Sequence, residues 1–261
     1  MNPQDELAGT EQPFVSHLME LRDRLIRALV AVAIGFGILC AYPGPSGLYD
    51  LLAQPLVAHL PKGSAMIATN VLSPFLVPLK ITLLAGFLLA LPFVLYQIWA
   101  FIAPGLYAHE KRLVLPLVVS STVLFFTGVA FSYFFVFGQV FRFIQGFAPK
   151  SITAAPDIEA YLSFVMTMFI AFGAAFEVPV VVVVLARMGI ISIAKLKEYR
   201  GYFIVVAFVV AAVITPPDIV SQLALAIPMC LLYEIGIWAA GLFLRYSRAP
   251  EDAEAQAPAD T

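Results

Sequence analysis

Two uncharged stretches of 29 residues, 81–109 and 113–141, constrain this chain more than any other feature, because neither contains Asp, Glu, Lys or Arg. A helix of about 20 apolar residues crosses the hydrocarbon core of a bilayer. Only 12% of the 261 residues are charged, against about 25% in a soluble domain. The apolar runs are continuous, whereas the strands of a membrane barrel alternate. The sequence therefore predicts an all-α, polytopic membrane protein.

Six transmembrane helices are predicted, at about 25–42, 75–102, 113–141, 161–186, 201–214 and 219–244. The first run is followed by "YPGPSG" and not by a small-residue cleavage site, so we expect a retained helix. The fifth and sixth spans are predicted to be short. Fourteen residues make a helix of about 21 Å, less than the hydrocarbon core of about 30 Å. Either flanking side chains snorkel or the bilayer thins locally around the fifth span, and we predict thinning.

The basic residues predict the orientation, because cytoplasmic loops are enriched in Lys and Arg. With the N-terminus inside, 11 of the 15 Lys and Arg residues fall on the inner side. Both termini are then cytoplasmic. We expect one polytopic domain over 1–261, with a cytoplasmic amphipathic segment at 1–24 and a disordered, acidic tail at 246–261.

Motifs for catalysis or metal binding are missing from the sequence. It contains no nucleotide-binding loop, no H-E-x-x-H and no G-x-S-x-G. Its two cysteines, Cys40 and Cys230, lie inside apolar runs and show no metal-ligand spacing. We therefore expect neither an enzyme nor a bound cofactor, metal or nucleic acid.

Two acidic residues lie within predicted spans. Glu177 precedes Pro179, which removes a backbone hydrogen bond and can kink the helix. An acid at this depth is either a hydrogen-bonded link between helices or a functional residue in a cavity. The second possibility allows an ion-coupled small-solute transporter that uses Glu177. For Glu234, packing between helices is the better interpretation.

Asp218 and Gln222 are four residues apart at the start of the sixth span, after "TPP". Asp is a favoured residue at a helix N-terminus, where its carboxylate caps free backbone N–H groups. We expect Asp218 to cap the helix, with contact to a partner as an added role.

The stretch "FVSHLMELRDRL" precedes the first span. Helical spacing places Phe14, Leu18, Leu21 and Leu25 in one stripe, and Glu20, Arg24 and Arg27 on the opposite side. Spacing alone favours an ordinary i,i+4 pair of Glu20 with Arg24. Glu110, between the second and third spans, could be a surface acid paired with Lys111 or Arg112, but neighbours in sequence do not face each other on a helix, which weakens that interpretation.

Six segments together resemble the TatC family, the multispanning subunit of the twin-arginine protein translocase. They are "HLMELRDRL", "MIATNVLSPF", "LYQIWAFIAPGLYAHEKR", "SYFFVFG", "YLSFVMTMFIAFGAAFEVPV" and "TPPDIVSQLALAIPMCLLYEIG", which together extend from about residue 14 to 246. Asn70 departs from the acid expected in relatives. The resemblance implies a concave, glove-like bundle in the bacterial inner membrane.

The resemblance also implies a receptor for twin-arginine signal peptides of folded cargo. Such a receptor works with the single-span subunits TatA and TatB, associates with itself and membrane lipid, and is powered by the proton-motive force. The signal-peptide site would include Glu20, Glu110, Arg22 and Phe101. Two carboxylates on one membrane face suit two arginines, because guanidinium groups pair bidentately with carboxylates. Further functional residues implied by the resemblance are Pro55, Tyr133, Glu177, Asp218 and Gln222.

Overall fold

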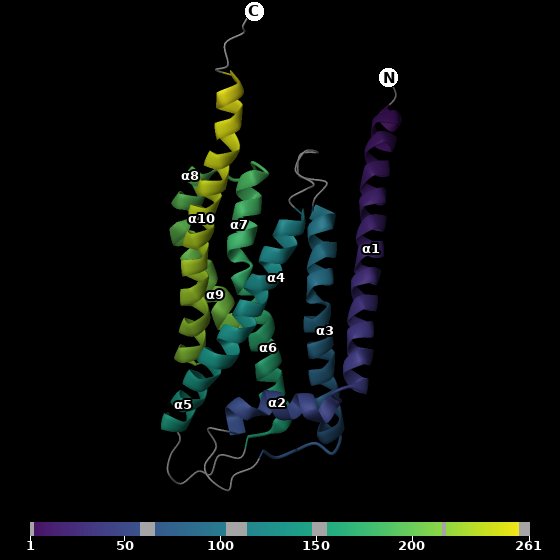
Figure 1. Ribbon diagram of the computed structural model, residues 1–261, viewed down its shortest axis with the longest axis vertical. Helices are drawn as coiled ribbons and strands as arrows, with labels where there is room; N and C mark the ends of the chain where they lie inside the picture. Colours follow the sequence, from purple (N-terminus) through teal and green to yellow (C-terminus); the bar gives the residue numbers. More distant parts are fainter. Residues whose placement is uncertain (1–2, 58–65, 103–113, 148–155, 216–217, 256–261) are drawn as a thin grey trace, which may run out of the picture. The chain divides into compact units, whose positions relative to one another are not determined.

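The described part of the chain is built of helices, as expected for an all-α protein (Figure 1). A computed structural model describes residues 3–57, 66–102, 114–147, 156–215 and 218–255. An isolated β-bridge joins Ile67 to Asp157. The helices are α1 (Pro3–Ala41), α2 (Pro45–Val57), α3 (Ser73–Ile102), α4 (Val114–Phe131), the π-helix η3 (Ser132–Val136), α5 (Phe137–Phe147), α6 (Ile158–Phe176), α7 (Val178–Arg187), α8 (Ile193–Glu198), α9 (Arg200–Ile214) and α10 (Ile219–Ala255).

Five helical segments in the described part of the chain are long and apolar enough to cross a membrane: Val15–Ala41, Ser73–Ile102, Val114–Phe143, Ile158–Arg187 and Ile219–Phe243. They correspond to predicted spans one to four and six. The predicted fifth span corresponds to α9, which has only 15 residues and is about 22 Å long. A short apolar helix is therefore present where the short fifth span was predicted.

The sixth span differs from the prediction of a short helix. Its apolar segment has 25 residues, which agrees with the predicted bounds of 219–244 and is long enough to cross a bilayer. The same helix reaches Ala255, well into the segment expected to be a disordered tail. Likewise α1 runs without a break from Pro3 into the first span.

The chain divides into two compact units, and the first comprises Met1–Ala53 and Ala68–Thr122. In it, α1 packs along α3 (Figure 1). The helices approach closely at Gly35 and Gly86: a Cβ atom on Gly86 would lie 2.6 Å from the backbone nitrogen of Phe36. The indole Nε1 of buried Trp99 donates a 2.9 Å hydrogen bond to Oγ of Ser121, which links α3 to α4.

The second unit comprises Gln54–Ile67 and Val123–Thr261. An aromatic core joins η3 and α5 to α6. The rings of Phe137 and Phe169 stack at 5.7 Å and 9°, and both side chains are buried. On the other side of this unit α7 packs against α10, with Gly236 so close that a Cβ atom there would lie 2.9 Å from Cα of Pro179.

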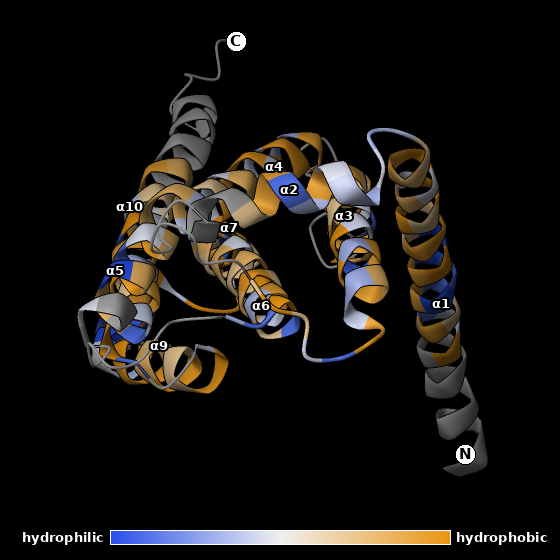
Figure 2. Cartoon of the chain, turned by 90° about the horizontal axis from the view of Figure 1, so that it is seen from below, coloured by the Kyte–Doolittle hydropathy of each residue, from blue (hydrophilic) through white to orange (hydrophobic). Residues whose placement is uncertain are grey.

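Many large apolar side chains lie exposed on the helices. Val205, Val209 and Val213 on α9 are 63%, 57% and 80% exposed, and Figure 2 shows α9 hydrophobic along its visible length. Soluble proteins do not leave such continuous apolar faces in water. These faces fit contact with lipid or with other membrane helices.

Candidate functional site

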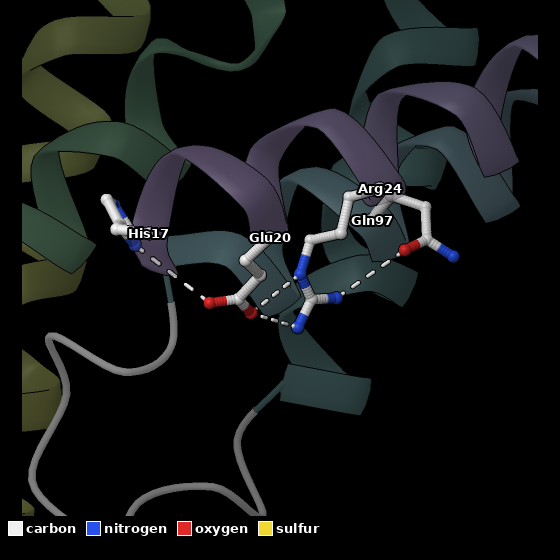
Figure 3. Close-up of polar contacts among 4 residues, drawn as sticks. All are labelled: His17, Glu20, Arg24 and Gln97. Carbon is white, nitrogen blue, oxygen red and sulfur yellow. Dashed lines mark hydrogen bonds and ion pairs between the residues drawn. The ribbon is translucent and has the colours of Figure 1, made fainter. Parts of the chain in front are cut away.

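A polar group joins α1 to α3 in the first unit (Figure 3). The Nε and Nη2 atoms of Arg24 donate hydrogen bonds of 2.9 Å and 2.7 Å to Oε1 of Glu20. The predicted i,i+4 pair is therefore confirmed. The two side chains are partly covered, with 22% of Arg24 and 35% of Glu20 exposed.

Gln97 anchors this pair to α3. Its Oε1 atom accepts a 3.5 Å hydrogen bond from Nη1 of Arg24, and Gln97 itself is only 5% exposed. The polar side of α1 thus faces α3, while Leu18, Leu21 and Leu25 are 48%, 43% and 57% exposed. The apolar stripe predicted from spacing exists and is exposed, as expected for an amphipathic helix at the membrane interface.

His17 and Phe101 extend the group at one end. Their rings stack at 4.3 Å with an interplanar angle of 16°. The Nδ1 atom of His17 lies 3.9 Å from Oε2 of Glu20, which is too far for a hydrogen bond. The structure therefore places Phe101, which was predicted as a site residue, one side chain away from Glu20.

The Glu20 carboxylate retains acceptor capacity. Both hydrogen bonds from Arg24 end on Oε1, and no hydrogen bond from the described residues ends on Oε2. An ionised carboxylate accepts about four hydrogen bonds, so Oε2 can take an incoming guanidinium. However, Arg24 already balances the charge of Glu20, so a second arginine needs either another acid nearby or displacement of Arg24.

Arg22, another predicted member of this site, is not brought to Glu20. Arg22 binds its neighbour instead: its Nε and Nη2 atoms donate 3.0 Å and 2.8 Å hydrogen bonds to Oδ1 of Asp23. The Arg22 side chain is 69% exposed. Glu110 lies outside the described residues.

Gln97 and His17 are members that sequence reasoning missed. Both lie inside the segments that carry the family resemblance. An amide within a charge-free run of 29 residues is itself a signal, because a polar group at this depth needs a partner.

Tyr133 lies in the π-helix η3, and Pro55 lies in α2. The Tyr133 ring contacts Phe134 edge-on at 5.0 Å and lies 6.4 Å from Phe169 of α6. A π-helical turn inserts an extra residue into a helix and is frequent at functional sites.

Glu177 stands at the break between α6 and α7, as the position of Pro179 predicted. Its backbone N–H still bonds to Ala174, at 3.1 Å. Both carboxylate oxygens of Glu177 are buried. The acid therefore lies within protein at this break.

Asp218 caps α10, which confirms the predicted cap. The backbone N–H of Ser221 donates a 2.7 Å hydrogen bond to Oδ1 of Asp218. The other oxygen, Oδ2, is buried and receives no hydrogen bond from the part of the chain described. One turn on, Nε2 of Gln222 donates a 3.4 Å hydrogen bond to the carbonyl of Phe208, which connects α10 to α9.

Glu234 forms an ion pair that the sequence did not predict. Its carboxylate binds Arg200 at the start of α9, with an Nε–Oε1 distance of 2.6 Å and an Nη2–Oε2 distance of 2.7 Å. This bidentate pair fits the predicted role of Glu234 in linking helices. The partners are 34 residues apart, so no local spacing could reveal them.

Comparison with known proteins gives a consistent result. Residues 16–228 match the model of the family described as Sec-independent protein translocase protein (TatC). The chain is 49% identical over 250 residues to the TatC of Halothiobacillus neapolitanus, which covers 95% of this chain and 68% of that protein. It is also 49% identical over 241 residues to the TatC of Escherichia coli K12, covering 92% and 93% of the two chains.

Among solved structures, the chain resembles a crystal structure of the twin-arginine translocase receptor TatC. The TM-score is 0.75 at 41% identity, and the match covers 87% of this chain and 98% of that one. These likenesses favour a translocase over the ion-coupled small-solute transporter considered from Glu177.

Proposed function

This chain belongs to the TatC family of Sec-independent protein translocase proteins, and we propose that it is the receptor of twin-arginine signal peptides, with Glu20 as an arginine-binding carboxylate. It is a membrane component of a protein-transport system. In this role it engages the signal peptide of a folded cargo protein before the cargo crosses the bacterial inner membrane, driven by the proton-motive force.

The observation that carries this proposal is the arginine already bound to Glu20. Two N–H groups of Arg24 donate hydrogen bonds to Oε1 alone. The carboxylate of Glu20 is therefore accessible to a guanidinium group and able to bind one. Arginine matches such a site better than lysine, because its planar fork donates several directed hydrogen bonds. A preference for an Arg-Arg motif follows from this chemistry.

Arg24 serves as the resting partner of Glu20. While no signal peptide is bound, Arg24 pairs with the partly covered carboxylate of Glu20 and offsets the cost of its lost solvation. A signal-peptide arginine either adds to Oε2 or replaces Arg24, which keeps a hydrogen bond to Gln97. Glu110 supplies the second negative charge that a pair of arginines requires, and Phe101 and Arg22 shape the surroundings of the motif.

The proposed topology has both termini in the cytoplasm, so that α1 presents Glu20 to the compartment where signal peptides are made. The basic residues favour this orientation. The partners are the single-span subunits TatA and TatB and further copies of this chain. The exposed apolar faces of α9 and α10 offer contact surfaces for such helices.

Five further residues are proposed to act in transport rather than in peptide recognition: Pro55, Tyr133, Glu177, Asp218 and Gln222. Tyr133 lies in a π-helical turn and Glu177 at a helix break, and such irregular turns are places where helices can rearrange. Asp218 caps α10 and Gln222 links α10 to α9, and α9 has an exposed apolar face that a partner helix can cover.

Photocrosslinking tests this proposal. A photoreactive amino acid placed singly at positions within 14–25 and 100–112 is expected to crosslink to an Arg-Arg signal peptide in membranes. Glu20→Ala and Glu110→Ala should each weaken the crosslinks while membrane insertion stays intact. Glu198→Ala is the control, because it removes an exposed acid of α8 that is not a member of the proposed site. Unchanged crosslinking in both glutamate variants would overturn the site assignment.

A further inference from the structure

A cavity of about 580 Å³ lies within the second unit, bounded by α7, α8, α9 and α10. Val181 of α7, Leu196 of α8, Val206 of α9 and Tyr233 of α10 contribute to its walls. This volume falls within the range of about 300–1,000 Å³ that small-molecule sites occupy.

The cavity wall is apolar despite its tyrosines. The hydroxyl of Tyr233 donates a 2.8 Å hydrogen bond to the carbonyl of Leu196, so the phenol oxygen is engaged with backbone. The Tyr233 ring stacks on Phe203 at 4.0 Å and 10°. A wall of aliphatic side chains and ring surfaces fits a hydrocarbon chain and not a polar solute.

The cavity opens through exposed apolar residues. Val181, Tyr202 and Val206 line it and are 44%, 72% and 53% exposed. They belong to helices assigned to the membrane, so the opening faces acyl chains. The short helix α9, about 22 Å long against a hydrocarbon core of about 30 Å, requires the bilayer to adapt beside this opening.

Positive charge lies at one end of the cavity. Lys195 and Lys197 flank Leu196 on α8, both are exposed, and neither forms an ion pair with any residue that the structure describes. Glu198 is also exposed, which leaves one net positive charge on α8. Arg200 is already paired with Glu234, so we assign the two lysines of α8 to a ligand.

The aromatic residues support a position at the membrane surface. Tyr199 and Tyr202 line the cavity beside α8 and contact each other edge-on at 6.0 Å. Tyrosine is enriched where hydrocarbon meets headgroups. Basic pockets between helices on the cytoplasmic side bind anionic lipid headgroups. The apolar cavity therefore suits the acyl chain of a phospholipid, the tyrosines suit the interface between hydrocarbon and headgroup, and the lysines suit the phosphate.

We propose that this cavity binds an anionic glycerophospholipid, with one acyl chain against α7 and α9 and the phosphate at Lys195 and Lys197. The lipid would fill the space beside the short α9. This proposal is independent of arginine recognition by Glu20.

Lipid retention by the purified full-length chain tests the proposal. The detergent-solubilised protein is titrated with phosphatidylglycerol or with phosphatidylcholine of the same acyl chains, and bound lipid is counted by native mass spectrometry. We expect phosphatidylglycerol to bind at least tenfold more tightly. Val206→Trp, which fills the cavity, should abolish this binding, whereas Val205→Trp, on the adjacent exposed residue outside the cavity, should leave it unchanged.

Removal of the cations gives a second variant that does not alter the cavity wall. Lys195→Gln combined with Lys197→Gln should lower phosphatidylglycerol affinity to that of phosphatidylcholine, while Arg142→Gln in α5 should not. Equal retention of the two lipids by the unmodified protein would overturn the proposal. Equal lipid binding by Val206→Trp and Val205→Trp would also overturn the proposal. That result is expected if the natural occupant of the cavity is a partner helix and not a lipid.

Discussion

Arg24 donates two hydrogen bonds, at 2.9 Å and 2.7 Å, to a single oxygen of Glu20, and leaves the second oxygen without a hydrogen-bond donor among the described residues. Arg24 therefore already binds part of the Glu20 carboxylate, which is proposed to bind the arginines of the signal peptide. Competition between the two guanidinium groups is the direct consequence.

Arg24→Gln is therefore expected to tighten binding of an Arg-Arg signal peptide. An i,i+4 or partly exposed ion pair is worth about 0.3–1 kcal/mol, so its loss should raise the affinity by up to about fivefold. Fluorescence anisotropy with a labelled signal peptide measures this. Arg27→Gln is the control for charge alone, because Arg27 is exposed on the same helix. Weaker binding by Arg24→Gln than by Arg27→Gln would show that Arg24 helps to bind the peptide.

Close contact at Gly35 and Gly86 should make the α1–α3 packing sensitive to a single methyl group. A Cβ atom on Gly35 would lie 2.7 Å from the carbonyl oxygen of Gly86, so Gly35→Ala should destabilise the protein by about 1–3 kcal/mol. Gly37→Ala is the matched control, since nothing lies within 4 Å of its Cβ position. Thermal unfolding in detergent compares the two. An equal melting temperature for both variants would argue against this close helix contact.

Substitution of Asp218 separates its cap from any further role. Asp218→Ala removes the oxygen that accepts from Ser221 and should cost about 0.5–2 kcal/mol, whereas Asp218→Asn keeps an oxygen and most of the stability. If the buried Oδ2 serves transport, Asp218→Asn should still lose export of a reporter protein. Full export by a stable Asp218→Asn variant would limit Asp218 to capping.

Four additional leucines in α9 would lengthen that helix by about 6 Å and relieve the mismatch with the bilayer. If local thinning contributes to transport, this variant should insert normally and export poorly. Replacing Val205, Val209 and Val213 together by leucine provides the control, because it changes the exposed side chains and keeps the length. Full export by the lengthened variant would exclude the thinning hypothesis.

The spans were predictable because long charge-free runs have few alternatives in a bilayer. The helix break at Glu177 and the cap at Asp218 followed from local chemistry, namely a missing N–H at Pro179 and an acid at a helix start. The predicted sixth span already passed through Pro228, but the extension of α10 to Ala255 was not predicted, because the alanines and glutamates of the tail also favour a helix.

The site was partly predictable for a similar reason. The pair of Glu20 and Arg24 is set by helical spacing, which the sequence contains. The contact of Arg24 with Gln97 joins residues 73 positions apart, and that of Arg200 with Glu234 joins residues 34 apart. Such partners depend on how helices pack, which spacing within one helix cannot specify.

The most direct test of arginine recognition by Glu20 is a comparison of two signal peptides on two proteins. Affinities of Arg-Arg and Lys-Lys versions of one peptide are measured for the unmodified chain and for Glu20→Gln. Hydrogen bonds to a charged group contribute about 1.5–3 kcal/mol, so Glu20→Gln should weaken Arg-Arg binding by about tenfold to a hundredfold and Lys-Lys binding far less. An equal loss for both peptides, or no loss for either, would contradict a guanidinium-binding role for Glu20.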